Sequence, residues 1–418
     1  MTRRLPAALA ALTALATFTA LAALTAAPAF AAGAAYATSG DCGGFPKLDL
    51  KTPAGWCVGL VARELRFARG VTALPNGDLI VAELGGWNPN HGRLSLLRKS
   101  QGYARSTLFE NLNLPHGVAV GPDKRVYVGV IGGVFRFDPA DPAKTRTDVI
   151  GGSSGVPALP DPGLHPLVSL VFDARGDLLL NVGSASDHCN AEDGTPPSPA
   201  KPCPESVGAQ AHGVIRRYAM RWPEGGATGH TVEAEGLRNS LALGLHRASG
   251  KLWQGENSRD AINKADPRLK DELLPHDELN LIVATRHYGW PYCYDQNVAS
   301  PEYPGYDCKS KTGPSLLLPP HAAPLSIAID NDARLPKPYT GAMLLTFHGY
   351  RKGGHRLVAY LMDASGTPTG SLIELISGWD SKQGANPLGA PVGVTIAEDG
   401  SVFITEDRNG TLLRLTKQ

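Results

Sequence analysis

The chain has 418 residues, including 48 glycines and 34 prolines, and its formal net charge is +1. A chain whose net charge is this close to zero lacks the excess of basic residues with which proteins bind nucleic acid or anionic membranes. The glycines and prolines indicate many turns, and the length allows either two domains or one long β-architecture.

The first 31 residues have the features of a secretory signal. Arg3 and Arg4 precede a long run of alanine, leucine and threonine that ends in Ala-Phe-Ala at 29–31, and the run contains no acidic residue. These are the charged start, apolar middle and cleavage site of such a signal. We expect cleavage near Ala32 and a periplasmic or secreted protein. An uncleaved anchoring helix is the alternative, and no later stretch is apolar enough to span a membrane.

The six cysteines form three pairs of sequence neighbours, each pair about fifteen residues apart. Neighbour-to-neighbour disulfides are the simplest interpretation in an exported chain, although spacing alone leaves other connectivities open. Each bridge would stabilise a local loop by about 3 kcal/mol. Zinc ligation is the rival, but the sequence contains no C-x-x-C pair. The pairs are Cys42 and Cys57, Cys189 and Cys203, and Cys293 and Cys308.

A repeated pattern runs through the chain: an apolar strand, a turn of the Asp-Gly or Asn-Gly type, and a second apolar strand. This is a strong local signal for a β-hairpin. Self-similarity of this kind points to a repeat architecture. The six copies lie at 68–84, 115–137, 165–184, 238–257, 323–349 and 390–415.

Six hairpins with further strands between them predict an all-β protein, a six-bladed β-propeller with four-stranded antiparallel blades. Segments 56–68 and 410–417 are strand-like, and we expect them to complete one blade from the two ends of the chain. The expected organisation is a signal at 1–31, an extension with a local disulfide at 32–55, and the propeller at 56–418. A β-sandwich or two separate β-domains are the alternatives.

The intervals 151–163, 186–208 and 261–276 are too long to be simple connectors. In a propeller we expect such loops to gather on one face and build a site.

Polar residues stand just before the hairpins or just after their second strands. A propeller brings such positions together at its axis, and this set suits an anionic, planar ligand that accepts hydrogen bonds. Taken singly, a histidine before a strand is more often a surface or core residue, and an Arg-Asn pair a solvated turn. The positions are His116, His165, Arg238, Asn239 and His321 before hairpins, and Asn257–Asp260, His348, Arg351 and Lys352 after them.

These residues lie in motifs that resemble the soluble quinoprotein sugar dehydrogenases, and most closely their sorbosone dehydrogenase-like branch. The resemblance covers nearly the whole mature chain. It implies a six-bladed propeller that binds pyrroloquinoline quinone (PQQ) flat over the axis, together with a calcium ion. The motifs are GLRN (236–239), GENSRD (255–260), PHDELNLI (275–282), HYGWPYCYD (287–295), PHAAPL (320–325), FHGYRKGGHRLVAY (347–360) and GAPVGVTIAEDGSVFITED (389–407).

The resemblance also implies roles for single residues. His165 would be the general base that takes a proton from a sugar hydroxyl while hydride passes to the quinone. Arg238 would stabilise the negative charge that develops on the quinone oxygen. The other implied or expected cofactor contacts are Asn239, Asn257, His348, His116 and Arg351, whose planar fork fits a carboxylate better than Lys352 does.

The resemblance also implies that main-chain carbonyls of Ser258 and Arg259 hold calcium, an ion that six to eight oxygens from any source can satisfy. Asp260 and Asp277 are the carboxylates expected nearby, and either could instead cap a turn. We expect the DELN motif at 277–280 to order its loop rather than to do chemistry.

Three departures from the glucose dehydrogenase branch concern the substrate side. Ser184 replaces an aspartate after the third hairpin, the segment 389–393 replaces a pair of arginines, and residues 261–276 separate ENSRD from DELN. We therefore expect a rebuilt substrate pocket, with glucose a weak candidate.

The sequence predicts an exported enzyme that oxidises an aldose, or a hydrated sugar aldehyde such as sorbosone, to a lactone or acid. Electrons would leave to a diffusible acceptor or a cytochrome, because the chain has no C-x-x-C-H haem motif. The alternatives are a calcium-dependent lactonase on the same propeller and a non-catalytic carbohydrate-binding propeller.

Overall fold

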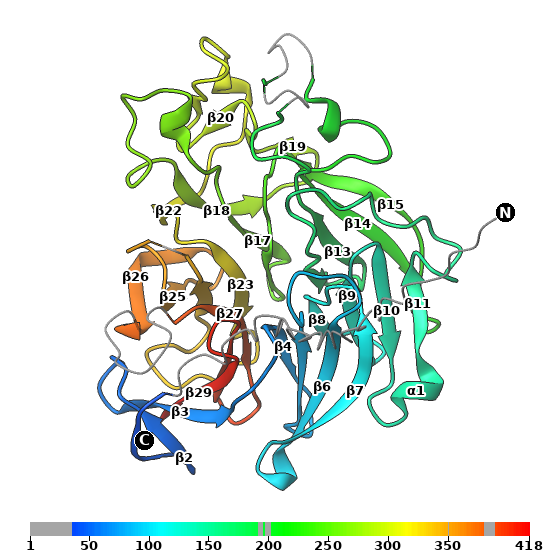
Figure 1. Cartoon of the computed structure of the whole chain (residues 1–418), viewed down its shortest axis with the longest axis vertical. Helices are drawn as coiled ribbons and strands as arrows, with labels where there is room; N and C mark the ends of the chain where they lie inside the picture. The colour runs from blue at the N-terminus through cyan, green and yellow to red at the C-terminus, as the bar shows by residue number, and fades with distance from the viewer. Residues whose placement is uncertain (1–35, 191–194, 197–201, 350, 380–388) are drawn as a thin grey trace, which may run out of the picture.

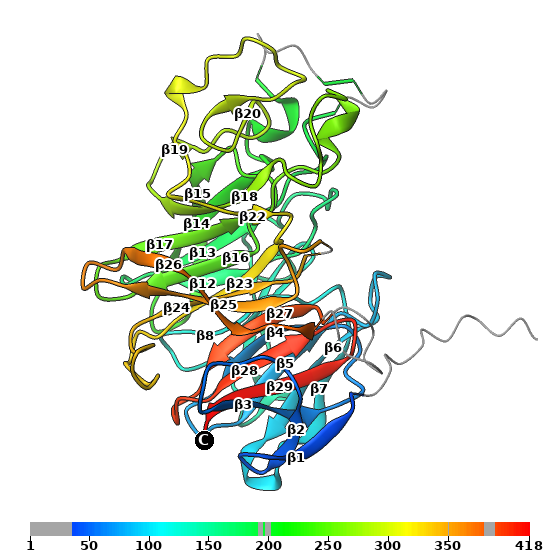
Figure 2. The same cartoon turned by 90° about the vertical axis from the view of Figure 1, so that its left-hand side faces the viewer.

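The computed structural model describes residues 36–190, 195–196, 202–349, 351–379 and 389–418, so the expected signal at 1–31 lies outside the described residues. The chain forms a six-bladed β-propeller, as expected, and its blades follow one another around the molecule in chain order (Figures 1 and 2). No helix in the described part of the chain is long and apolar enough to cross a membrane.

The first three blades each form from one continuous stretch of chain. They contain β4 (Ala68–Ala73), β5 (Leu79–Glu83), β6 (Gly92–Arg98) and β7 (Ala104–Leu112); β8 (Val118–Val120), β9 (Val126–Val130), β10 (Gly133–Phe137) and β11 (Thr147–Ile150); and β12 (Leu170–Phe172), β13 (Leu178–Val182), β14 (Val214–Arg221) and β15 (Gly226–Glu235).

The last three blades include the one that joins the two ends of the propeller. They contain β16 (Ala242–His246), β17 (Lys251–Glu256), β18 (His276–Ile282) and β22 (Leu316–Pro320); β23 (Pro324–Ile329), β24 (Met343–Phe347), β25 (Arg356–Met362) and β26 (Pro368–Ile376); and β27 (Pro391–Ile396), β28 (Val402–Glu406), β29 (Thr411–Lys417) and β3 (Trp56–Ala62).

Short elements extend the blades. The strands β1 (Thr38–Cys42) and β2 (Phe45–Leu48) continue the sheet of β3, and β19 (Arg286–His287) adds in parallel to β15, so two blades exceed the expected four strands. Added strands cover edges that would otherwise expose unpaired backbone groups. The remaining elements are β20 (Cys293–Tyr294), β21 (Val298–Ala299), α1 (Pro142–Thr145) and 3-10 turns at Lys99–Gln101, Pro204–Ser206, Ile262–Lys264 and Cys308–Ser310.

The first strands of the blades form a closed ring around the axis. Strand β4 contacts β8 and β27, β12 contacts β8 and β16, and β23 contacts β16 and β27. All six therefore start at the same end of the axis, which brings residues from distant parts of the sequence to one place.

The ring is closed by pairing between the two ends of the chain, as expected. Strand β29 pairs antiparallel with β3, with Leu413 opposite Leu60 and Leu415 opposite Val58. Leu413 and Leu415 pack towards β24 and β25, whereas Leu412 faces the other side and packs against residues of β4 and β5. The closing strand is buried on both faces, which explains its apolar run.

All three neighbour-to-neighbour disulfides form, with Cα–Cα distances of 5.9, 6.1 and 6.0 Å. The Cys42–Cys57 bridge ties β1 to β3. The Cys189–Cys203 and Cys293–Cys308 bridges pack in one cluster with Trp290, Tyr292 and Tyr303 and brace loops that have little regular structure of their own. Such a set is typical of proteins from an oxidising, extracellular environment.

We predict that Leu413→Ala lowers the free energy of unfolding by about 3 kcal/mol, because it leaves a cavity in the closing blade. Urea denaturation followed by circular dichroism measures this. Lys417→Ala, at the exposed end of the same strand, is the control and should change the free energy by less than about 0.5 kcal/mol. If the two changes lowered the free energy of unfolding equally, the packing of the closing blade would contribute little to stability.

Candidate active site

A cavity of about 520 Å³ opens at the end of the axis where the first strands begin. Nine of the predicted site residues line it, and they come from the third, fourth and fifth blades. The first and sixth blades add residues that sequence reasoning missed. The predicted lining residues are His165, Arg238, Asn239, Asn257, Ser258, Asp260, Asp277, His348 and Arg351. His321, which the sequence also marked as a position before a hairpin, lines the cavity too, and the residues that were missed include Phe67, Arg69, Trp87, Leu164, Asp407 and Arg408.

Two predicted residues do not line the cavity. His116 is buried behind Arg69 and accepts a hydrogen bond from its Nε at 3.2 Å, so in this structure it supports a lining residue. Burial and the Arg69 cation hold the pKa of His116 well below its usual value. The Arg259 side chain pairs with Glu302, and only its main chain is available for the expected role.

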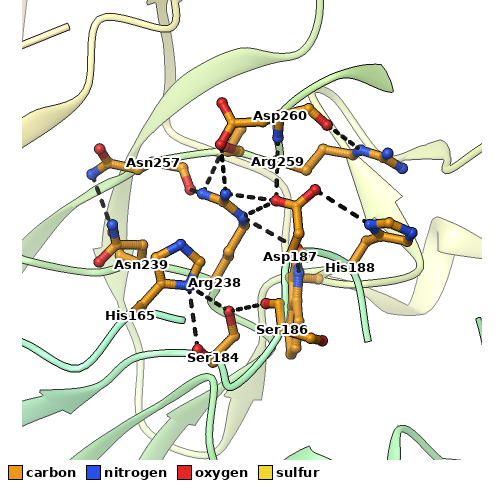
Figure 3. A network of polar contacts seen from close by, with 12 residues as sticks. His165, Ser184, Ser186, Asp187, His188, Arg238, Asn239, Asn257, Arg259 and Asp260 are labelled. Atoms are coloured by element: carbon orange, nitrogen blue, oxygen red, sulfur yellow. Dashed lines mark hydrogen bonds and ion pairs between the residues drawn. The ribbon is translucent and has the colours of Figure 1, made fainter. Parts of the chain in front are cut away.

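His165 has one defined tautomer. Its Nδ1 lies 2.8 Å from Ser184 Oγ, and Ser184 Oγ donates its hydrogen to the carbonyl of Ser186 at 2.6 Å (Figure 3). Because a serine hydroxyl carries a single hydrogen, the Nδ1–H of His165 must be the donor to Ser184. Nε2 then holds a lone pair, and it has no hydrogen-bond partner among the described residues.

The environment of His165 also keeps the imidazole neutral. Burial and the nearby Arg238 cation lower the pKa of His165 to about 3. A histidine with a depressed pKa stays in its basic, neutral form at every pH above that value. The Nε2 lone pair of His165 is therefore unprotonated over the whole neutral range, although the lowered pKa makes it a weaker base than a free imidazole.

Arg238 is held from several sides (Figure 3). Asp187 Oδ1 lies 2.8 Å from its Nε and 2.6 Å from its Nη2, and Asp260 Oδ2 lies 2.9 Å from Nη2. The carbonyls of Asn257 and Ser258 accept hydrogen bonds from Nη1 at 3.0 and 2.9 Å. Since every guanidinium nitrogen has an oxygen within 3.0 Å, this buried cation has a fixed position.

Asp187 is the residue of this group that sequence reasoning missed. It lies in the long interval 186–208, two residues before Cys189. The predicted site loop and the predicted disulfide were therefore the only features of the sequence that could have pointed to Asp187. Burial raises the pKa of Asp187, but His188 and Arg238 outweigh it and hold that pKa well below its usual value. The carboxylate is therefore charged beside Arg238.

Asp277 orders the loops beside the cavity, as the DELN motif suggested. Its two oxygens accept the backbone N–H groups of Ser258 at 2.9 Å and Ala323 at 2.6 Å, so it joins two blades. Burial raises its pKa to about 7. The Asn257 amide donates to the carbonyls of Asn239 and Pro324 and reinforces the same junction.

His348 and Arg69 share one buried carboxylate on another wall. Asp407 lies 3.1 Å from His348 Nε2 and 2.6 Å from Arg69 Nη1. Burial by itself raises the pKa of Asp407. The opposing effects of His348 and Arg69 are larger, so the pKa falls to about 2. Arg351, in contrast, is 41% exposed and pairs with Asp271 from the interval 261–276.

The lining suits a planar anion that carries several carboxylates. Four arginines and three histidines line the cavity with three aspartates. Asn257 and Ser258 carbonyls and the Asp260 carboxylate offer oxygens for a cation, because a carbonyl that accepts one hydrogen bond keeps a second lone pair. Within the described ranges, the one group of three clustered metal-ligating side chains is Cys189, Cys203 and Glu205, and its cysteines form a disulfide.

We predict that the His165 ring signal does not titrate between pH 8 and pH 4.5 in NMR spectra of the cofactor-free protein, because its pKa lies near 3. In Ser184→Asp a carboxylate beside Nδ1–H favours the cation, so the midpoint should rise into this window. The signal is assigned by its loss in His165→Gln. A midpoint near 6.5 in the unaltered protein would contradict the described environment.

Comparisons with known proteins find a matching family and several relatives. The family model described as TrAA12-like matches residues 50–418. The "Pyrroloquinoline quinone-dependent sugar dehydrogenase" of Hypocrea jecorina is 23% identical over 415 residues, which cover 86% of this chain and 88% of that protein. An uncharacterized protein of Borreliella burgdorferi is 25% identical over 193 residues, 44% of this chain and about half of that protein (48%).

Among solved structures, the calcium structure of the Trichoderma reesei family AA12 enzyme superposes with a TM-score of 0.68. It is 21% identical and covers 92% of this chain and 100% of that one, a likeness that shows the fold. Because the family model covers nearly all of the chain after residue 49, this protein belongs to the TrAA12-like family.

Proposed function

We propose that this protein is an exported PQQ- and calcium-dependent dehydrogenase that oxidises an aldose or a hydrated sugar aldehyde, of the sorbosone kind, to the lactone or acid. The observation that carries the proposal is the unpartnered Nε2 of a neutral histidine on the wall of an arginine-lined cavity. The name of the Hypocrea jecorina relative supports it.

The residues that would hold the cofactor are those that can pair with carboxylates and ring carbonyls. Arg69, Arg351 and Arg408 would supply cations along the walls of the cavity. Arg238 and Asn239 would supply hydrogen-bond donors on the side of His165. Bound PQQ would supply the two-electron, hydride-accepting chemistry that no side chain offers. Calcium would take main-chain oxygens at Asn257, Ser258 and Arg259 with the exposed carboxylate of Asp260, and Asp277 would support these loops.

His165 would perform the proton transfer. Its Nε2 would accept the proton of the hydroxyl on the carbon being oxidised, while bound PQQ would supply the two-electron acceptor for the hydride that leaves that carbon. Ser184 holds the ring so that Nε2, and not Nδ1, faces the substrate. Arg238, fixed by Asp187 and Asp260, places positive charge beside the site where negative charge develops.

Localisation and partners belong to the same proposal. Three disulfides support action in the periplasm or outside the cell. Electrons would pass to a diffusible acceptor or a cytochrome.

The test is dye reduction by purified protein supplied with calcium and PQQ, using a panel of aldoses and sugar aldehydes. We expect turnover, and we expect His165→Ala to lower kcat about 100-fold or more while PQQ still binds. His246→Ala, at the other end of the axis, is the control. Hydrolysis of a lactone with calcium alone would favour the lactonase, and near-normal turnover by His165→Ala would remove it as the base.

A second variant tests the clamp around Arg238. Arg238→Lys should weaken PQQ binding and lower kcat, each by about 10-fold, because a lysine cannot reach the acceptors that the planar guanidinium satisfies. Fluorescence titration with PQQ and steady-state kinetics measure the two effects. Unchanged values would show that Arg238 acts only in folding.

A further inference from the structure

Two large apolar side chains are exposed where the cavity opens. Trp87 is 57% exposed and Leu164 is 56% exposed, and both line the same cavity as His165. No other tryptophan belongs to the exposed large hydrophobic residues of the described chain. Apolar groups that remain exposed at a cavity mouth commonly mark a place where a ligand binds.

The segment that carries Trp87 is held at its base. Leu84 donates its backbone N–H to the carbonyl of Phe67 at 2.9 Å, and Gly85 donates to the carbonyl of Arg66 at 2.9 Å. Gly85 has a φ of +74°, and a Cβ there would lie 2.0 Å from the carbonyl oxygen of His91. The loop therefore requires glycine at 85. Because the two backbone hydrogen bonds close the loop where it begins, Trp87 extends from a fixed backbone.

Phe67 adds a second aromatic ring to this wall. It lines the cavity, and its φ of +54° is uncommon for a bulky residue with a Cβ. A strained backbone conformation of this kind is kept only where the surrounding contacts enforce it, and such conformations are common at ligand sites. Leu164, which precedes the first strand of the third blade, donates its backbone N–H to the carbonyl of Ala185 at 2.9 Å. This hydrogen bond fixes its backbone.

Resting on the proposed function, we propose that Phe67, Trp87 and Leu164 form an apolar subsite that stacks against the C–H face of a pyranose ring. A pyranose has an apolar face and polar edges, and a rigid aromatic side chain binds such a face at low entropic cost. Leu164 directly precedes His165, and both line the cavity, so a ring held between Trp87 and Leu164 would lie in the cavity that contains the proposed base. The subsite selects six-membered sugars over short aldehydes.

The test compares substrates of two sizes on the calcium- and PQQ-loaded enzyme. Trp87→Ala should raise KM for pyranose aldoses about 10-fold with kcat within about twofold, whereas KM for glyceraldehyde, too small to span the wall, should stay within about twofold. Trp87→Phe keeps an aromatic face and should restore most of the affinity. Val298→Ala, an exposed apolar residue outside the cavity, is the control.

A binding measurement separates this inference from the proposed chemistry. Calorimetric titration with 1,5-anhydroglucitol, a pyranose without an anomeric hydroxyl, should show binding to the unaltered protein and about 10-fold weaker binding to Trp87→Ala. This holds even if no substrate is oxidised, which would refute only the dehydrogenase. Equal affinity of the two proteins, or an equal rise in KM for glyceraldehyde, would overturn the subsite.

Discussion

The pairing of β3 with β29 is the constraint on which the rest of the structure depends. It ties the two ends of the propeller into one sheet, so the ring of first strands cannot open without breaking this ladder. Leucines on both faces of β29 then pack against the preceding and the following blade. Because the ring is closed, residues as far apart in sequence as Arg69 and Asp407 meet on the wall of one cavity.

Charge pairing then determines the shape of that cavity. A buried cation is costly unless it is paired, and here Arg238 lies among two carboxylates and two carbonyls, while Asp407 lies between Arg69 and His348. These groups are held in place by one another, and fixed charges of this kind are the condition for electrostatic stabilisation of a transition state. Asp260 and Arg351 are the more exposed members of these pairs, with side chains 71% and 41% exposed.

Much of the architecture could be predicted because its signals are local. Turns such as the one at Gly77, with a φ of +83°, favour glycine between two apolar strands, and Gly77, Gly176, Gly250 and Gly400 mark four of the six hairpins in this way. Neighbouring cysteines about fifteen residues apart close short loops, and all three bridges formed. The extra strands β1, β2 and β19 were not predicted, because edge pairing depends on which backbone lies nearby in the folded molecule.

The sequence by itself determined the propeller, its closure and most of the positions around the axis, since each depends on periodicity or on its place in the repeat. The spacing of the cysteines favoured the three disulfides without excluding other pairings. Only the tertiary structure decided which side chains line the cavity. It placed His116 behind Arg69, turned Arg259 towards Glu302, and brought Asp187 to Arg238 and Trp87 to the cavity mouth. The direction of a loop side chain depends on the partners that the folded chain places around it, and those partners come from other blades.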